Sequence, residues 1–175
     1  DNYPLQLSGG MRQRVCIALA IARSKQLLIA DEPGTSLDVT IQDQILRLLN
    51  QIAAEKQMAI ILISHSLGVI REWTNQVYVM YAGSIVEEST TEELFSHPLH
   101  PYTQALMDCV PRLTGGGTAE GIPGRIPDYF NPPTGCRFHP RCPRAFALCS
   151  EKKPALYRVN DTHQVACYLY QEANQ

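Results

Sequence analysis

The side chains most able to do chemistry are two carboxylates that follow a short apolar run. Asp31 and Glu32 come directly after the run over residues 27–30, and His65 comes soon after a second run over residues 58–63. In an open parallel sheet, ligands bind beyond the carboxyl ends of the strands, so these groups are expected to reach the same edge. Asp31 can there hold Mg²⁺, usually through water. Glu32 can orient and deprotonate a water for in-line attack on a γ-phosphate.

A second candidate site is the turn Ser8-Gly9-Gly10. The Ser8 hydroxyl can cap a helix predicted over residues 9–24. Free amides and the positive end of the dipole make a helix N-terminus a site for anions, and glycines allow a phosphate to approach closely. Taken alone this turn is weak evidence. Its order and spacing relative to Asp31-Glu32 and His65 argue against chance agreement.

The elements that must position these groups follow from hydrophobic periodicity. Asp38 is a suitable cap for a helix whose apolar residues recur at helical spacing, from Ile41 to Ile52. The run over residues 58–63 is apolar throughout, as expected for a parallel strand covered on both faces. Residues 76–81 and 84–88, separated by Ala82-Gly83, predict a hairpin at the edge of the sheet. The pattern predicts an α/β fold.

The character of the chain changes after residue 88. Helices are predicted over residues 91–96 and 102–110, with a break at the two prolines between them. A segment rich in Gly and Pro over residues 112–135 reads as a linker. We therefore divide the chain into a nucleotide-binding part (1–90), a helical and linker part (91–135) and a Cys-rich extension (136–175).

Four of the six cysteines lie in that extension, as C-x5-C-x6-C-x17-C: Cys136, Cys142, Cys149 and Cys167. Four thiolates can hold a [4Fe–4S] cluster or a tetrahedral Zn²⁺. The spacing alone does not choose between these metals. Buried thiols or two disulfides are the simpler alternative, although a tail of forty residues has little apolar core of its own. His139 and His163 are possible zinc ligands, with a surface position the expected alternative for both.

Together these residues resemble an ATP-binding subunit of an oligopeptide/dipeptide-type ABC transporter. The resemblance runs from the signature segment over residues 7–13 to the Walker B pair and the switch histidine. It implies that Asp31 holds Mg²⁺, that Glu32 is the catalytic base and that His65 is a catalytic residue near the γ-phosphate. Gly34 stands where this family usually has a hydroxyl residue, which leaves the catalytic rate open.

The resemblance also implies contacts with ATP held on the phosphate loop of an opposite subunit, by way of Ser8, Gly9, Gly10, Gln13 and Asp38. The implied fold is the C-terminal half of a P-loop NTPase parallel sheet with helices, followed by the small Cys-rich extension. Some members of the peptide-importer group bind a [4Fe–4S] cluster through four cysteines that follow a segment like residues 98–103. The resemblance therefore favours iron–sulfur over zinc.

Composition limits the partners. A net charge of −2 gives no electrostatic case for nucleic acid. The longest apolar run, residues 58–63, is far below the roughly 20 residues that cross a bilayer. We therefore expect no direct membrane insertion. The resemblance implies a peripheral position on the cytoplasmic face of the membrane, through transmembrane permease subunits and a second ATP-binding subunit, identical or related.

No G-x-x-x-x-G-K-[ST] phosphate loop occurs in the 175 residues. We interpret the chain as an incomplete portion of an ATPase that drives peptide import, and we expect it to bind ATP weakly or not at all by itself. Two alternatives stay open. The chain can be a truncated, non-catalytic interaction module that carries a metal, or part of the ATPase of a nickel importer.

Overall fold

The computed structural model describes residues 3–23, 26–35, 37–109 and 121–174. It divides into two compact units, Asp1–Trp73 and Thr74–Gln175, which are described separately below. Within the described residues, no helix combines the length and the apolar composition that crossing a bilayer requires. The elements of the first unit are η1 (Pro4–Gln6), α1 (Gly9–Arg23), β1 (Leu27–Asp31), α2 (Val39–Lys56), β2 (Ala59–Ile63) and α3 (Leu67–Trp73).

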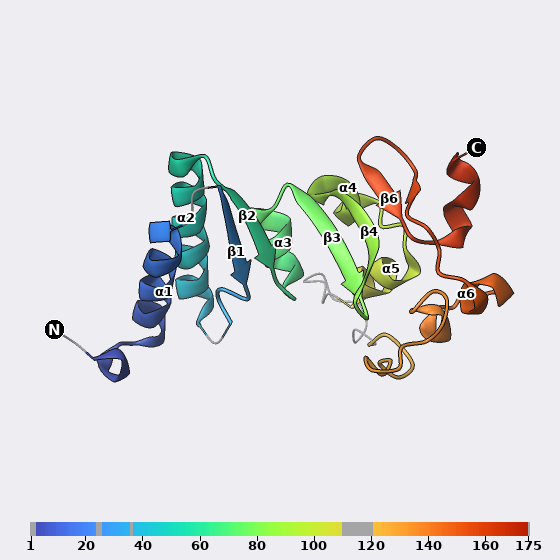
Figure 1. Cartoon of the computed structure of the whole chain (residues 1–175), viewed down its shortest axis with the longest axis horizontal. Helices are drawn as coiled ribbons and strands as arrows, with labels where there is room; N and C mark the ends of the chain where they lie inside the picture. The colour runs from blue at the N-terminus through green and yellow to red at the C-terminus, as the bar shows by residue number, and fades with distance from the viewer. Residues whose placement is uncertain (1–2, 24–25, 36, 110–120, 175) are drawn as a thin grey trace, which may run out of the picture. The chain divides into compact units, whose positions relative to one another are not determined.

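The first unit is built on a parallel pair of strands, in which Ile29 of β1 lies opposite Ile61 of β2. Successive strand residues point to opposite faces. One face, which includes Leu28 and Ala30, is buried in a core with residues of α1 and α2. Both helices lie on the same side of the strand pair (Figure 1).

The other face of this strand pair is exposed. Ile29 is 61% exposed and Ile61 is 48% exposed, and Leu27 and Ile63 beside them are similarly open. The prediction that the second strand is covered on both faces is therefore wrong for the described residues. Parallel strands are ordinarily covered on both faces, so this face is suited to a further layer of protein.

The start of α2 follows the sequence prediction. Asp38 is extended (φ −66°, ψ 156°), and its carboxylate accepts a hydrogen bond from the backbone N–H of Ile41 at 2.9 Å. The helix ends at Lys56, and the C-cap residue Gln57 adopts a left-handed conformation with φ 51°. Ile45 and Leu49 are buried one turn apart on the face toward the core, as the periodicity predicts.

The second unit contains an antiparallel sheet with the strand order β3-β4-β6-β5. Its β4 pairs with β6, so that Glu87 lies opposite Val165. Strands from the hairpin and from the C-terminal tail thus form one sheet. The elements are β3 (Gln76–Tyr81), β4 (Ser84–Thr90), α4 (Thr91–Ser96), α5 (Pro101–Asp108), η2 (His139–Arg141), α6 (Ala147–Glu151), β5 (Tyr157–Arg158), β6 (His163–Val165) and η3 (Tyr168–Asn174).

The predicted hairpin forms, with Ala82 (φ 46°) and Gly83 (φ 74°) in its turn. Positive φ at both central residues suits the right-handed twist of a two-residue hairpin. Its place was predicted wrongly, because among the described residues it joins β6 rather than the parallel strands. A pairing across about 80 residues leaves no local pattern in the sequence.

The predicted helix over residues 91–96 has the same bounds in the structure. α5 begins at Pro101 and ends at Asp108, while residue 110 of the predicted helix and residues 112–120 of the predicted linker lie outside the described residues. Residues 121–135 contain no helix or strand. Arg141 donates hydrogen bonds to the carbonyls of Ile122 and Pro123, which fixes this end of the segment.

Candidate functional site

The carboxyl ends of β1 and β2 meet at one edge of the strand pair. Asp31 lies opposite Ile63, and the backbone N–H of Glu32 donates to the carbonyl of Ile63 at 2.9 Å, one step beyond the ladder. Glu32 then turns with φ 45°, a left-handed conformation that is uncommon for a residue other than glycine. His65 follows β2 at the same edge. The geometry expected from the sequence is therefore present.

Glu32 and His65 are in direct contact. Glu32 Oε1 accepts a hydrogen bond from the backbone N–H of His65 at 2.9 Å and lies 2.7 Å from its Nδ1. Glu32 Oε2 accepts a hydrogen bond from the Thr35 hydroxyl at 2.7 Å. These bonds lower the pKa of Glu32, with Thr35 as the largest cause and His65 next. The His65 side chain is 80% exposed, so its other nitrogen is open to a ligand.

Thr35 was not singled out from the sequence. It lies three residues after Glu32 in the turn that follows β1, where a hydroxyl can reach back to a carboxylate. The signal was present in the sequence, because Thr35 stands next to Gly34, the position noted for lacking a hydroxyl. The hydroxyl that contacts Glu32 therefore belongs to Thr35, one residue after Gly34.

Asp31 ends β1 with an exposed side chain, next to Glu32. Among the described residues, no group of three or more His, Cys, Asp or Glu side chains is arranged to hold a metal ion. The assignment of Asp31 to Mg²⁺ therefore stays a prediction. One carboxylate is enough for a site that is completed by waters and substrate phosphates, which is how Mg²⁺ is often held.

The Ser8-Gly9-Gly10 turn begins α1 as predicted. The Ser8 hydroxyl accepts a hydrogen bond from the backbone N–H of Met11 at 3.3 Å. A Cβ on Gly9 would lie 3.3 Å from Leu37 Cδ2, and one on Gly10 would lie 3.1 Å from Ile41 Cγ2. Both glycines therefore let the start of α1 approach the start of α2.

The other two residues predicted to contact the nucleotide, Gln13 and Asp38, belong to these same two helices. Asp38, the cap of α2, is exposed and lies between Leu37 and Ile41 in sequence. Gln13 lies on α1 with a half-buried side chain. The starts of two helices, each with free backbone amides and the positive end of a dipole, thus lie beside each other. The structure supplies a packing reason for the glycines in addition to the predicted phosphate contact.

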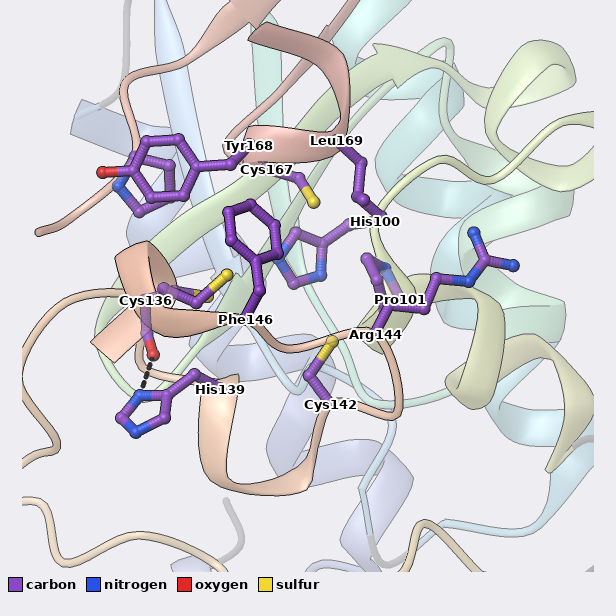
Figure 2. A pocket seen from close by; sticks show the side chains of 12 residues that line it. His100, Pro101, Cys136, His139, Cys142, Arg144, Phe146, Cys167, Tyr168 and Leu169 are labelled. Atoms are coloured by element: carbon purple, nitrogen blue, oxygen red, sulfur yellow. Dashed lines mark hydrogen bonds between the residues drawn. The ribbon is translucent and has the colours of Figure 1, made fainter. Parts of the chain in front are cut away.

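The four cysteines of the tail lie around one small cavity of about 20 Å³ in the second unit. Figure 2 shows Cys136, Cys142 and Cys167 directed toward the same hollow as His100 and Phe146. In the described part of the chain, these four tail cysteines form no disulfide. Burial raises the pKa of Cys136 and Cys142, and it raises the pKa of Cys167 to about 11. These thiols are neutral at pH 7, which disfavours a role as nucleophile.

The two histidines considered as zinc ligands have other partners. His163 is 1% exposed, and its Nε2 lies 2.7 Å from Glu87 Oε1, so the expected surface position of His163 is wrong. His139 is half-buried on the cysteine cavity, and its Nδ1 lies 2.9 Å from the carbonyl of Cys136. Neither residue belongs to a metal-holding group among the described residues.

His100 also lines the cysteine cavity and was not singled out from the sequence. It is the N-cap residue of α5, and its Nδ1 accepts a hydrogen bond from the backbone N–H of Tyr102 at 3.0 Å. Its Nε2 is buried and has no hydrogen-bond partner in the described part of the chain. Burial lowers the pKa of His100 to about 4, so the ring is neutral at pH 7.

A fully buried carboxylate holds His100 in place. Glu87 Oε1 accepts a hydrogen bond from the backbone N–H of Leu99 at 2.7 Å, and Oε2 accepts one from that of His100 at 2.9 Å. With the His163 contact, Glu87 ties β4 to β6 and to the segment before α5. Glu is rarely buried unless it is paired, so a Glu or a His in the sequence is ordinarily expected at the surface. The sequence alone therefore did not single out Glu87 and His100.

Two family matches cover parts of the chain. Residues 1–35 match the family described as ABC transporter, and residues 86–149 match the family described as oligopeptide/dipeptide transporter, C-terminal region. The first match contains the Ser8 turn and the Asp31-Glu32 pair. The second contains Glu87, His100 and three of the four tail cysteines.

The chain is also similar in sequence to longer proteins that are named as ATP-binding proteins of peptide transporters. The chain is 48% identical over 174 residues to the probable peptide ABC transporter ATP-binding protein y4tR of Sinorhizobium fredii, covering 98% of this chain and 52% of that protein. It is 47% identical over 172 residues to the oligopeptide transport ATP-binding protein AppD of Bacillus subtilis, covering 98% of this chain and 52% of that protein. It is 47% identical over 169 residues to the dipeptide transport ATP-binding protein DppD of Haemophilus influenzae, covering 96% of this chain and 51% of that protein. The chain spans about half the length of these relatives.

Proposed function

Because this chain belongs to the family of ATP-binding proteins of oligopeptide and dipeptide ABC transporters, we propose that it carries the water-activating part of an ATPase that drives peptide import. The contact between Glu32 and His65, at the carboxyl edge of two parallel strands, carries this proposal. It puts an ionised carboxylate and an open imidazole at the edge where such sheets bind ligands. The cargo is inferred from the names of the relatives.

The hydrogen bonds of Glu32 indicate which oxygen acts as the base. A carboxylate oxygen has two lone pairs. Oε1 already accepts from two donors of His65, whereas Oε2 accepts only from Thr35. Oε2 therefore takes the proton of the attacking water, while the water oxygen bonds to the γ-phosphorus and the bond to the bridging oxygen breaks, releasing ADP and phosphate. The exposed Nε2 of His65 donates to a phosphate oxygen when both ring nitrogens bear a proton.

The other site residues follow the family pattern. Asp31 holds Mg²⁺, which when bound offsets the negative charge of the phosphates. The paired starts of α1 and α2 supply free amides and glycines for a nucleotide held mainly by the opposite subunit. The residues on these two starts are Ser8, Gly9, Gly10, Gln13 and Asp38.

The partners follow from this division of the site. The complete transporter pairs two ATP-binding subunits, identical or related, so that each nucleotide lies between them. Transmembrane permease subunits hold the pair at the cytoplasmic face of the membrane. Closure of the two subunits on ATP moves the permease, and hydrolysis resets it. The names of the relatives, which are ATP-binding proteins of peptide transporters, support only the link to a transporter.

For the tail, we propose that the four cysteines hold a [4Fe–4S] cluster, with Zn²⁺ as the alternative. A single zinc ion needs four thiolates about 2.3 Å from one centre, whereas a cluster binds each thiolate at a different iron and so accepts a wider ring. The four cysteines line one cavity, which supports a group that all four share.

A chimera tests the ATPase proposal. The first half of AppD from Bacillus subtilis is joined to this chain and assembled with its permease partners in vesicles. We expect ATP-dependent uptake of peptides. We also expect Glu32→Gln to lower ATP hydrolysis by about 10²- to 10⁴-fold, the usual contribution of a general base.

Glu55→Gln is the matched control, because Glu55 is exposed on α2 and makes a hydrogen bond only one turn away, to Gln51. This variant is expected to hydrolyse ATP like the unmodified chimera. Equal hydrolysis by the Glu32 and Glu55 variants would contradict the role of Glu32. A chimera that hydrolyses ATP without moving peptides would contradict the cargo alone.

A further inference from the structure

We propose that His100 donates a hydrogen bond from its Nε2–H to a sulfur of the group bound by the four tail cysteines, and that this bond raises the reduction potential of that group. This inference rests on the iron–sulfur proposal above and adds a positioning residue that reaches the cysteine cavity from α5. The reduction potential of the cluster would then depend on a residue that lies outside the Cys-rich segment.

The protonation of the ring follows from its contacts. Nδ1 accepts the backbone N–H of Tyr102, so Nδ1 bears a lone pair and the proton of the neutral ring lies on Nε2. Nε2 is thus a buried donor, and none of the described residues accepts its hydrogen bond. A buried donor without an acceptor bears the full cost of its lost hydration, so an acceptor is expected in the space beside it.

The cavity offers sulfur as that acceptor. His100 lines it together with Cys136, Cys142, Cys149 and Cys167 (Figure 2). Thiolates and inorganic sulfides of a cluster carry negative charge and accept hydrogen bonds, whereas neutral thiols are weak acceptors. A donor already in place is therefore matched better to the loaded site than to four free thiols.

The other cationic or imidazole side chains around the cavity are less suited to this bond. His139 already uses Nδ1 at the carbonyl of Cys136. Arg144 is exposed, so water competes for its N–H groups. His100 alone among these three is almost fully buried, at 1% exposure. A hydrogen bond that water cannot replace has the greater effect on a charged sulfur.

The backbone on both sides of His100 is fixed. Glu87 accepts the N–H groups of Leu99 and His100. The Gln104 side chain donates to the carbonyls of Pro98 and Leu99. The direction of the imidazole is thereby set by contacts that do not involve the cysteines. A pre-positioned donor loses little freedom when the cluster arrives.

The test compares His100→Asn with His97→Asn in the anaerobically purified 175-residue chain. Asn is a good N-cap residue, so it retains the bond to the Tyr102 N–H but is too short to donate into the cavity. His97 is exposed three residues earlier and serves as the matched control. Iron content is measured first, followed by a redox titration monitored by visible absorption. At a given potential we expect about tenfold less reduced cluster in His100→Asn, equivalent to about 59 mV for one electron.

Each outcome separates the two proposals. Iron in all three proteins with equal potentials would overturn the role of His100 and leave the cluster standing. Wild-type protein with zinc or without metal would overturn the cluster and this inference together. If His100→Asn does not assemble a cluster, nitrogen hyperfine coupling is measured in reduced wild-type protein labelled with ¹⁵N-histidine. Coupling to a protonated imidazole nitrogen supports the bond, and its absence contradicts it.

Discussion

The two units of the chain differ in the polar groups that they bury. In Asp1–Trp73 the described buried core is apolar, and the residues proposed for nucleotide chemistry lie exposed or half-buried at a strand edge and on two helix starts. In Thr74–Gln175 the buried residues include Glu87, His100 and His163 together with hydroxyl side chains. One unit thus presents its polar chemistry outward, and the other encloses it.

This difference indicates what each unit needs from its surroundings. The outward site of the first unit acts on a ligand supplied from outside, and its strand pair leaves one apolar face uncovered. The second unit satisfies Glu87 with three internal donors, which ties the tail to the hairpin. We therefore expect mutations in the second unit to act on stability and those in the first to act on association or chemistry.

The largest expected effect is the loss of the Glu87 charge. In Glu87→Gln an amide group replaces one carboxylate oxygen and faces N–H donors that require acceptors. We expect the second unit to lose about 3 kcal/mol of unfolding free energy, the range for breaking a buried pair. Denaturant unfolding measures this loss, and hydrogen exchange of the Leu99 and His100 amides should become faster.

The neighbouring residue supplies the control for this prediction. Glu88 is on the same strand and is less buried, and its partners are exposed side chains: its Oε1 accepts a 3.3 Å hydrogen bond from Gln76, and Tyr78 also bonds to it. Glu88→Gln is expected to change stability by no more than about 0.5 kcal/mol. Equal effects of the two substitutions would remove the contrast between the hydrogen-bonded, buried carboxylate of Glu87 and the surface around it.

The second prediction concerns the uncovered strand face. In Ile61→Lys a charge replaces an exposed apolar side chain beside Ile29. We expect self-association of the 175-residue chain to weaken by about tenfold or more, because large exposed apolar patches drive association and one buried Ile contributes about 1.5–3 kcal/mol. Sedimentation velocity measures it.

Gln51→Lys adds the same charge to the exposed side of α2 and controls for net charge. It should leave association nearly unchanged. If both lysine variants dissociate equally, charge repulsion rather than the strand face is responsible, and the first unit does not need a further layer at this position.

Local signals in the sequence predicted the first unit well. Asp38 and the periodic residues after it specify a helix and its start without help from the rest of the chain. Glu32 and His65 meet because two parallel strands bring their carboxyl ends to the same edge, a rule that applies whatever the details of packing. The apolar run over residues 58–63 did not by itself indicate the exposed second face, since an apolar strand has the same pattern whether its cover is present or not.

The second unit depended on contacts that leave little local trace. The strands β5 and β6 have two and three residues, too few to show alternation. Glu87 reads as a surface residue until β6 and the segment before α5 enclose it. The four cysteines were recognised by type, but the cavity that they share with His100 results from tertiary packing.

The smallest expected effect is on the acidity of Glu32. Thr35→Val removes the hydrogen bond that is the largest cause of its lowered pKa, so the pKa of Glu32 should rise toward its ordinary value of 4.5. It should remain below that value, because His65 still donates to Oε1. Titration of the Glu32 carboxyl carbon by NMR measures the shift, and Thr35→Ser, which keeps the hydroxyl, is the control.

The sign of the pH dependence follows from this change. A carboxylate whose pKa is lowered on folding adds stability above its unfolded pKa, and that stability is lost as pH falls through the folded pKa. The Thr35→Val protein should therefore lose less stability than wild type when the pH falls. Above the unfolded-state pKa of Glu32, the stability of both proteins should change with pH at nearly the same rate. An unchanged Glu32 pKa in Thr35→Val would mean that the Thr35 hydroxyl does not bond to Oε2 in solution. It would also remove the reason for assigning the role of base to Oε2 rather than to Oε1.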